Sequence, residues 1–341
     1  MPIRFAINGL GRVGRALLRI AHDRDDLELA AVNDVIPARQ LARLVARDTV
    51  HGPFSAPVEA VGDGIAIAIA GRTIPVFQQS EPTAVDWSRE GVQVVVEATG
   101  RFLKRTAAAG HLGGTVRWVV LSANPDPEDP ADATICLGVN GEALNPSRQA
   151  VISNSSCTTN CLALLTKVLH DRFGLRRALM STVHSYTENQ RLLDEPHPDP
   201  RRARAAALNI IPTETTTPRT LGLVLPELAG RVEGFAVRVP TPAVAMMDLA
   251  ADLETAVTAE AIRQAFRDAT DEMTGPMAGL LGVTDEELVS SDFIGDPRSA
   301  VVDLPLVQVA AGGLARVVAW YDNEWGYAHR LADLLERLTI G

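Results

Sequence analysis

Residues 3–14 read IRFAINGLGRVG, an apolar strand followed at once by glycines in the pattern G-x-G-x-x-G. The three glycines are Gly9, Gly11 and Gly14, and a helical run with an apolar face follows them. Such a turn is tight and lets the backbone approach a pyrophosphate, whose charge meets the N–H groups at the helix N-terminus. The pattern alone is weak evidence, because glycine-rich turns also occur by chance. Its place between a strand and a helix predicts a dinucleotide-binding loop.

Asp34 follows the next apolar strand, Leu27–Val32, at about the spacing of 20 residues expected for a ribose-binding acid. A carboxylate there can accept hydrogen bonds from both hydroxyls of the adenosine ribose, and it repels a 2′-phosphate. No arginine follows Asp34 directly, although Arg39 is close in sequence. We therefore predict NAD rather than NADP. The alternative is an ordinary tight turn with a solvated aspartate.

Further apolar segments at Val92–Val96 and Val116–Leu121 alternate with helical stretches. This rhythm predicts an α/β fold, with a Rossmann-type doubly wound parallel sheet at the N-terminal end. The pattern changes near residue 155, where we place a domain boundary. Beyond it we expect further helices and strands, listed in chain order: helix Cys157–Val168, strand Ala178–His184, a long polar stretch Ser185–Arg204, strands Gly234–Val239 and Ala243–Leu249, helix Thr258–Ala269, strand Leu314–Trp320 and helix Glu324–Leu338.

The composition of the 341 residues is that of an ordinary globular protein, with 46% hydrophobic and 22% charged residues. A net charge of −10 argues against a general nucleic-acid binder and against a polybasic membrane-surface protein. Three cysteines make no disulfide scaffold, which favours a reducing compartment. We find no apolar run long enough to span a membrane, and because the sequence enters a strand pattern at once we expect no signal peptide. We expect a cytoplasmic protein.

Cys157 stands in a run of hydroxyl side chains where an apolar helix begins. The N–H groups and dipole of a helix N-terminus favour a thiolate, so we expect a lowered pKa for this thiol. Cys161, one turn later, is expected to be a buried small hydrophobe. His184 is the best placed of the seven histidines to stabilise the thiolate as an ion pair and then to move protons. The alternative is a cysteine and a histidine with structural roles only.

Other uses of cysteine and histidine explain the sequence less well. No C-x-x-C or H-E-x-x-H spacing is present, so we predict no metal site. A cysteine protease or thiol acyltransferase could use Cys157 and His184, but neither would need the dinucleotide loop. A thiol together with a dinucleotide indicates aldehyde oxidation through a thiohemiacetal, hydride transfer and a thioester.

With these motifs in hand, the chain resembles the phosphorylating glyceraldehyde-3-phosphate dehydrogenase family. The resemblance extends over nearly the whole chain, in family order, and is carried by INGLGRVG at 7–14, SCTTN at 156–160, TVHSYT at 182–187, RVPTP at 238–242 and WYDNEWGY at 320–327. It implies an NAD-binding domain at 1–156 with a C-terminal helix, 324–341, packed on it. It also implies an α+β catalytic and oligomerisation domain with a mixed sheet at 157–323, and a homotetramer.

The resemblance also assigns residue roles. Cys157 would attack the aldehyde, and His184 would activate the thiol and take the hydroxyl proton as hydride leaves. The backbone N–H of Cys157, with His184, would bind the developing oxyanion. The cofactor residues would be Gly9, Gly11, Arg12, Val13, Gly14, Asp34, Thr99, Ser122, Asn323 and Tyr327. Thr187 and Arg238 would bind the phosphate of glyceraldehyde 3-phosphate, and the residues expected to line the sites for that phosphate and for inorganic phosphate are Ser156, Thr158, Arg202, Thr215 and Thr216. For Arg201 and Arg204 a solvated basic run is an equal alternative.

Three departures from the family pattern bear on the substrate and the acyl acceptor. Asn189 stands where many members carry an aspartate, Thr215–Pro218 replaces Thr-Gly-Ala-Ala, and Glu195-Pro196 replaces Leu-Pro. A glutamate at 195 would oppose a 2′-phosphate and supports NAD. Erythrose-4-phosphate dehydrogenase is the alternative on the same fold, with water as acceptor. Another oxyanion such as arsenate as acceptor, and a redox-sensing or binding protein without turnover, also stay open, as does the physiological direction.

Overall fold

The computed structural model describes residues 2–271, 275 and 277–338. These residues form two compact units, each described here by itself. The first unit holds the described residues up to Ile135, then Gly141–Ser155 and those from Ala328 onward. The second unit holds Cys136–Asn140 and Ser156–Tyr327. Within the described ranges, no helix is both long enough and apolar enough to cross a membrane.

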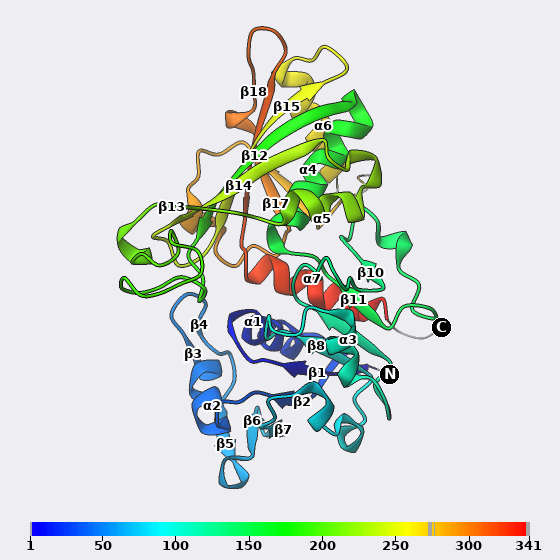
Figure 1. Ribbon diagram of the computed structural model, residues 1–341, viewed down its shortest axis with the longest axis vertical. Helices are drawn as coiled ribbons and strands as arrows, with labels where there is room; N and C mark the ends of the chain where they lie inside the picture. The colour runs from blue at the N-terminus through cyan, green and yellow to red at the C-terminus, as the bar shows by residue number, and fades with distance from the viewer. Residues whose placement is uncertain (1, 272–274, 276, 339–341) are drawn as a thin grey trace. The chain divides into compact units, whose positions relative to one another are not determined.

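The first unit is built on a nine-stranded sheet in the order β10-β11-β9-β8-β1-β2-β7-β6-β5 (Figure 1). Its strands are β1 (Ile3–Asn8), β2 (Leu27–Asn33), β5 (Val58–Val61), β6 (Ala66–Ile69), β7 (Arg72–Phe77), β8 (Val94–Glu97), β9 (Trp118–Leu121), β10 (Ala133–Thr134) and β11 (Val151–Ser153), and β3 (Arg47–Asp48) pairs with β4 (Gly52–Pro53) apart from it. Its helices are α1 (Arg12–His22), α2 (Ala38–Ala46) and α3 (Arg105–Ala108), and α7 (Trp325–Glu336) begins in the second unit and continues in the first.

The strands from β10 to β7 are all parallel, β6 is antiparallel to β7, and β5 is antiparallel to β6, so in this sheet β6 alone runs against the common direction. All four residues of β8 are buried, as expected for a valine-rich strand inside a parallel sheet. From β1 the chain passes to β2 on one side and later to β8 on the other. The strand order therefore reverses at β1, which is where doubly wound sheets bind their ligands. The predicted Rossmann-type sheet is confirmed.

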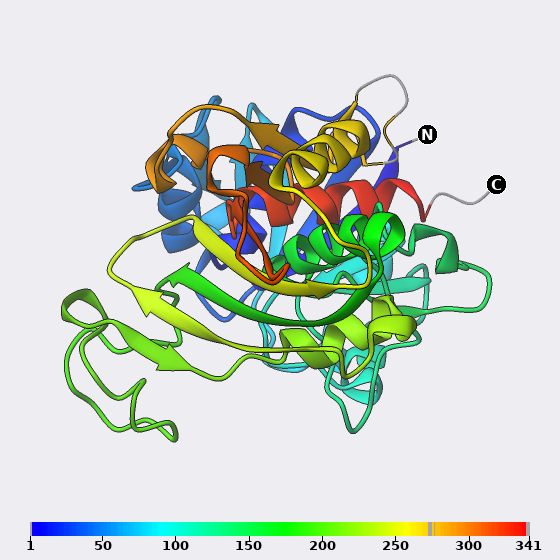
Figure 2. The same ribbon diagram turned by 90° about the horizontal axis from the view of Figure 1, so that it is seen from above.

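The second unit is built on a mixed sheet in the order β13-β14-β12-β15-β19-β17-β16, with β18 paired to β19. Its strands are β12 (Leu175–Ser185), β13 (Ile211–Thr213), β14 (Val232–Val239), β15 (Ala245–Leu253), β16 (Leu281–Thr284), β17 (Ala300–Asp303), β18 (Gln308–Val309) and β19 (Ala315–Tyr321). Figure 2 shows β12, β14 and β15, green to yellow, running side by side. β14 is parallel to β12 and β15 is antiparallel to it, so the expected mixed sheet is confirmed.

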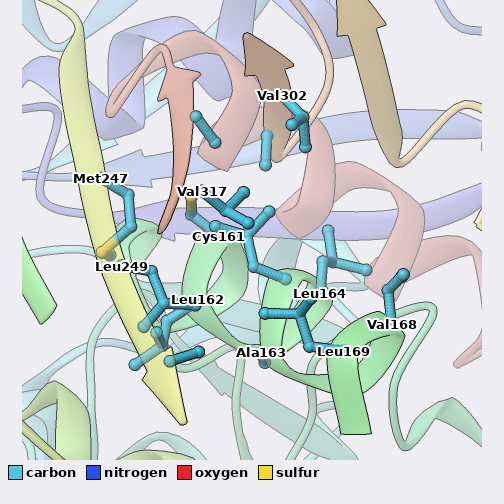
Figure 3. Close-up of a cluster of buried hydrophobic side chains, with 14 of the residues drawn as sticks. Cys161, Leu162, Ala163, Leu164, Val168, Leu169, Met247, Leu249, Val302 and Val317 are labelled. Atoms are coloured by element: carbon cyan, nitrogen blue, oxygen red, sulfur yellow. The ribbon is translucent and has the colours of Figure 1, made fainter. Parts of the chain in front are cut away.

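Three helices pack with this sheet in a single hydrophobic cluster: α4 (Cys157–Phe173), α5 (Thr217–Val224) and α6 (Ala259–Thr270). α4 is buried at every position from Thr158 to Thr166, and Figure 3 shows its side chains from Cys161 to Leu169 in one cluster with Met247, Leu249 and Val317 of the sheet. Cys161 is fully buried in this cluster, as predicted. The apolar stretch of α4 therefore fixes the helix against the sheet, and with it the position of Cys157 at its first turn.

Candidate active site

The second unit brings the ends of three elements together around Cys157. Ser156 caps α4, because its side-chain oxygen accepts a hydrogen bond from the N–H of Thr159 at 3.1 Å. Cys157 is therefore the first residue of the helix. In the sheet, His184 of β12 is the direct partner of Arg238 on β14. His184 is also the partner of Ala245 on β15, which in turn is the partner of Tyr321 on β19. His184, Arg238 and Tyr321 therefore lie in one row across the sheet.

The predicted thiol and imidazole lie within contact distance. Sγ of Cys157 is 3.7 Å from Nε2 of His184 and 3.8 Å from Oγ1 of Thr158. His184 is 3% exposed, and Cys157 as a whole residue is partly exposed. A thiol and an imidazole at this distance can exchange a proton once Nε2 is the unprotonated nitrogen of the ring, which is the requirement for nucleophilic catalysis.

The other ring nitrogen of His184 contacts two groups. Nδ1 lies 2.8 Å from the carbonyl oxygen of Ser185 and 2.6 Å from Nη1 of Arg238. The same Nη1 donates to the Ser185 carbonyl at 2.9 Å. Arg238 is thus held between the ring and the backbone, and its Nε is buried without a hydrogen-bond partner among the residues that the structure describes. A buried donor of this kind can be satisfied by an anion.

The expectation of a lowered thiol pKa is wrong for this arrangement. Burial raises the pKa of Cys157, and the opposing effects of the Thr158 hydroxyl and the Arg238 charge are smaller. Burial, followed by the charge of Arg238, lowers the pKa of His184 from 6.5 to about 3. The pair is therefore a neutral thiol and a neutral imidazole near pH 7. The helix N-terminus acts on the sulfur, but desolvation of the charged form is the larger effect.

Tyr321 is a residue of this site to which the sequence analysis gave no role. Its hydroxyl lies 3.0 Å from Oγ1 of Thr158 on α4 and 2.7 Å from Oγ1 of Thr182 on β12. Its ring meets His184 edge-on, with ring centroids 6.0 Å apart. A tyrosine at the end of an otherwise apolar strand was the available signal, because a buried hydroxyl needs a partner.

Asn323 and Tyr327, predicted to bind the cofactor, also lie in the second unit. Oδ1 of Asn323 accepts a hydrogen bond from Oγ of Ser185 at 3.0 Å, which turns the amide nitrogen away from Ser185. Tyr327 is 5% exposed and lies in the first turn of α7. Ser185 thus connects the amide of Asn323 with the residue that follows His184 in the chain.

The predicted phosphate residues lie on several segments of the second unit. Arg238 and Thr158 lie at the thiol, and a surface pocket is lined by residues that include Arg202, Thr215 and Thr216. Burial lowers the pKa of Arg238, and the charge of Arg202 adds to this effect, so the two arginines interact. Nε of Arg202 donates to Oγ1 of Thr213 at 2.8 Å and lies 3.5 Å from Asp199.

Thr187 donates from both its N–H and its hydroxyl to Oε1 of Gln190, at 2.7 and 3.0 Å. Arg204 forms an exposed ion pair with Asp194, as the alternative interpretation of the basic run expects. Asn189 contacts Nε2 of His197 through its Oδ1 at 3.1 Å.

The glycine loop of the first unit fits a dinucleotide. Gly9 has a φ of +95°, and a Cβ on it would lie 2.8 Å from Thr99. A Cβ on Gly14 would collide with the carbonyl oxygen of Gly9, so α1 can approach β1 only with glycine there. A Cβ on Gly11 would meet nothing within 4 Å, which leaves open space at the N-terminus of α1. This open space beside backbone N–H groups suits a pyrophosphate.

Asp34 is held in place for a ribose. Its Oδ2 accepts from the N–H of Leu10 at 2.8 Å and its Oδ1 from the N–H of Ile36 at 3.0 Å. The guanidinium of Arg12 pairs with Asp48. Arg12 is also the first residue of α1, so its backbone lies at the helix N-terminus beside the glycine loop. Val13 follows it there, and Ser122 comes directly after β9 and donates its N–H to the carbonyl of Glu97 at 3.0 Å.

Comparison with known proteins agrees with both units. The model for the glyceraldehyde 3-phosphate dehydrogenase NAD binding domain matches residues 3–105, and the model for the C-terminal domain of the same family matches residues 156–323. The chain is 45% identical to glyceraldehyde-3-phosphate dehydrogenase of Priestia megaterium, over 99% of each chain. It is 46% identical to glyceraldehyde-3-phosphate dehydrogenase 1 of Bacillus subtilis and to the glyceraldehyde-3-phosphate dehydrogenase of Geobacillus stearothermophilus, in both cases over 98% of this chain and 97% of the relative. The chain therefore belongs to the glyceraldehyde 3-phosphate dehydrogenase family, as an oxidoreductase that uses NAD.

Proposed function

We propose that the chain oxidises glyceraldehyde 3-phosphate with NAD and inorganic phosphate, giving 1,3-bisphosphoglycerate. The observation that carries this proposal is the arrangement of Cys157, His184 and Arg238, with the thiol 3.7 Å from the imidazole and the imidazole 2.6 Å from the guanidinium. This arrangement supports roles for Cys157 as a nucleophile, His184 as a base and Arg238 as a binder of anions. The names of the relatives support the same reaction.

Cys157 is the nucleophile of the proposed reaction. Its Sγ adds to the aldehyde carbon and its proton passes to Nε2 of His184, which forms a thiohemiacetal. The backbone N–H of Cys157 and the imidazolium stabilise the negative charge that develops on oxygen. The imidazolium gives its proton to this oxygen, which leaves the thiohemiacetal hydroxyl and a neutral His184. His184 then takes the hydroxyl proton as the carbon is oxidised to a thioester, and NAD when bound supplies the acceptor for the hydride. Attack of inorganic phosphate on the thioester releases the thiolate and the acyl phosphate.

The residues of the first unit would hold the adenosine and pyrophosphate parts of NAD. Gly11 with the N-terminus of α1 would receive the pyrophosphate, Asp34 the ribose hydroxyls, and Thr99 and Ser122 would lie along the cofactor. From the second unit, Asn323 would donate its amide nitrogen to the nicotinamide carboxamide, with Tyr327 close by. We propose a cytoplasmic homotetramer, with the NAD-binding domain at 1–156 and 324–341 and the catalytic domain at 157–323.

Two anion sites are required, one for the substrate phosphate and one for inorganic phosphate. Arg238 supplies a charged donor at the thiol, and Thr187 follows shortly after His184 on the same segment. For inorganic phosphate we propose the pocket that Arg202, Thr215 and Thr216 line. Hydroxyl groups and a guanidinium in such a pocket suit phosphate oxygens.

A steady-state comparison of aldehydes tests the proposal. Reduction of NAD is measured with glyceraldehyde 3-phosphate and with erythrose 4-phosphate, each with inorganic phosphate, with arsenate and with neither. We expect turnover on the three-carbon substrate to require the oxyanion and to be at least about tenfold faster than on the four-carbon substrate. Phosphate-independent turnover that is faster on erythrose 4-phosphate would overturn the proposal.

A pair of variants tests the inorganic-phosphate pocket. Arg202→Gln is expected to raise the KM for inorganic phosphate by about tenfold, with a smaller effect on the KM for the aldehyde. Arg204→Gln is the matched control, because its guanidinium pairs with Asp194 on the surface. Equal effects of the two variants would remove Arg202 from the site.

A further inference from the structure

A row of buried polar side chains extends across the carboxyl ends of three adjacent strands in the first unit. Asn33, Asn8 and Glu97 are the last residues of β2, β1 and β8, which lie next to one another in the sheet. They are 4%, 2% and 1% exposed. Asn33 immediately precedes Asp34, Asn8 immediately precedes Gly9, and Glu97 lies two residues before Thr99. Asp34, Gly9 and Thr99 are all proposed to bind NAD.

Glu97 makes the largest number of the hydrogen bonds described in this row. One of its oxygens, Oε1, accepts from the N–H of Thr99 at 2.9 Å and from the Thr99 hydroxyl. The other, Oε2, accepts from the side-chain amide of Asn8 and lies 3.1 Å from Nε2 of His111. Asn8 in turn accepts from Nδ2 of Asn33 at 2.6 Å. The side chains of three strand ends are therefore linked without a break.

The direction of the bond from His111 follows from Trp87. Nε1 of Trp87 is only a donor, and it lies 3.1 Å from Nδ1 of His111. Nδ1 must therefore accept, and the proton of the neutral ring is on Nε2, where it is donated to Glu97. All four groups around Glu97 are donors, so the carboxyl group is an acceptor on both oxygens.

Such an arrangement tolerates little change. A carboxylate that is fully buried is costly unless every donor is in place, and a donor left without an acceptor is costly in turn. The bond to Thr99 fixes the backbone directly after β8, and the bond to Asn8 fixes the residue before Gly9. The Cβ of residue 9, if there were one, would touch Thr99, so these two loops are in close contact.

We propose that Glu97 is a positioning residue for NAD, which holds the Gly9 loop and the Thr99 loop in their binding geometry before the cofactor arrives. Loops ordered in advance cost less entropy on binding, so Glu97 contributes affinity although its side chain lies beneath the loops. This inference rests on the proposed NAD-binding residues, and it concerns affinity for the cofactor and not the chemistry at Cys157.

The test is a calorimetric titration of NAD into the full-length chain and its Glu97→Gln variant, with no substrate present. The glutamine amide keeps the shape but presents a donor to one of the existing donors. We expect the Kd for NAD to rise by about tenfold. Alkylation of Cys157 by iodoacetamide is measured in parallel and should be unchanged, so a failure of the proposed chemistry does not affect the outcome.

Asp303 offers a matched control. It is the last residue of β17 in the second unit, 3% exposed, and its carboxylate accepts from Nε1 of Trp320 at 3.1 Å. Asp303→Asn should lower stability and leave the Kd for NAD unchanged. A Kd for Glu97→Gln within twofold of wild type, or an equal rise in Asp303→Asn, would overturn the proposal.

A second variant covers the case in which Glu97→Gln does not fold. His111→Phe removes one donor to Glu97 from outside both loops, and we expect it to raise the Kd for NAD by a smaller factor. If this variant folds and binds NAD as tightly as the wild type, Glu97 does not position the cofactor loops through its hydrogen bonds.

Discussion

Nη1 of Arg238 lies 2.6 Å from Nδ1 of His184, and the two residues are direct partners in neighbouring parallel strands. A guanidinium has no acceptor atom, so Nδ1 must be the acceptor. The neutral ring then carries its proton on Nε2, which faces Sγ of Cys157 at 3.7 Å. In this tautomer the imidazole can donate to the sulfur but cannot take its proton.

The tautomer that acts as a base needs a different partner for Nδ1. The carbonyl oxygen of Ser185 already lies 2.8 Å from Nδ1 and can accept its proton once the guanidinium is directed at an anion. Binding of a phosphate by Arg238 and conversion of His184 to a base are therefore compatible with each other.

Arg238→Gln tests the electrostatic part of this relationship. The charge of Arg238 lowers the pKa of Cys157 and also the pKa of His184, so its removal should raise both. The pH profile of Cys157 alkylation by iodoacetamide should shift to higher pH, and the KM for glyceraldehyde 3-phosphate should rise by about tenfold or more. Arg231→Gln is the control, because Arg231 donates to the carbonyl of Leu175 instead. An unshifted alkylation profile in Arg238→Gln would contradict the argument.

Much of the fold could be predicted because its signals are local. The glycine loop, the valine-rich strands and the apolar helix after Cys157 depend on patterns within a few residues. Element ends were less accurate: the strand expected at Gly234–Val239 begins at Val232, and the one expected at Val116 begins at Trp118. Strand ends are set by hydrogen bonds to neighbouring strands, which a single apolar pattern does not contain.

The catalytic residues of the site could be predicted from the sequence, but the protonation states of their side chains could not. Residue types and order indicated Cys157 and His184, yet nothing local indicates that β14 pairs with β12 so as to place Arg238 beside His184. The same pairing, with burial, holds the imidazole neutral. Tyr321 was missed as a site residue because its two hydroxyl partners are far away in the sequence, on α4 and β12.

Cys157→Ser should abolish turnover and leave NAD binding intact. A hydroxyl is a far weaker nucleophile than a thiol at this pH, so we expect kcat to fall by at least about 10³-fold. Cys161→Ala provides the control, since Cys161 lies one turn along the same helix in the apolar core. Turnover that survives in Cys157→Ser would mean that the nucleophile is another group.

Tyr321→Phe should loosen the connection between the helix of Cys157 and the strand of His184. The ring stays against His184 while the hydroxyls of Thr158 and Thr182 lose a shared partner. We expect the free energy of unfolding to fall by about 1–2 kcal/mol and kcat to fall severalfold, with the Kd for NAD unchanged. Thr166→Val removes a buried hydroxyl that donates to the carbonyls of Leu162 and Ala163 in its own helix, and kcat should then be unaffected. A loss of stability with unchanged kcat in Tyr321→Phe would make the tyrosine purely structural.

His184 should make the stability of the chain depend on pH in mildly acidic solution. Its pKa is about 3 in the folded chain and 6.5 ordinarily. Above pH 6.5 the ring is neutral in both states and contributes no pH dependence. As the pH falls from 6.5 towards 3, the unfolded chain binds a proton that the folded chain does not, so the free energy of unfolding decreases.

His184→Asn isolates this contribution, because the other groups titrate in both proteins. The free energy of unfolding is measured by urea denaturation at a fixed protein concentration between pH 7 and pH 4.5. The stability of the wild type relative to His184→Asn should decrease steadily as the pH falls through this window. If the difference stays constant, the imidazole is protonated in the folded chain near its ordinary pKa, and burial beside Arg238 does not hold it neutral.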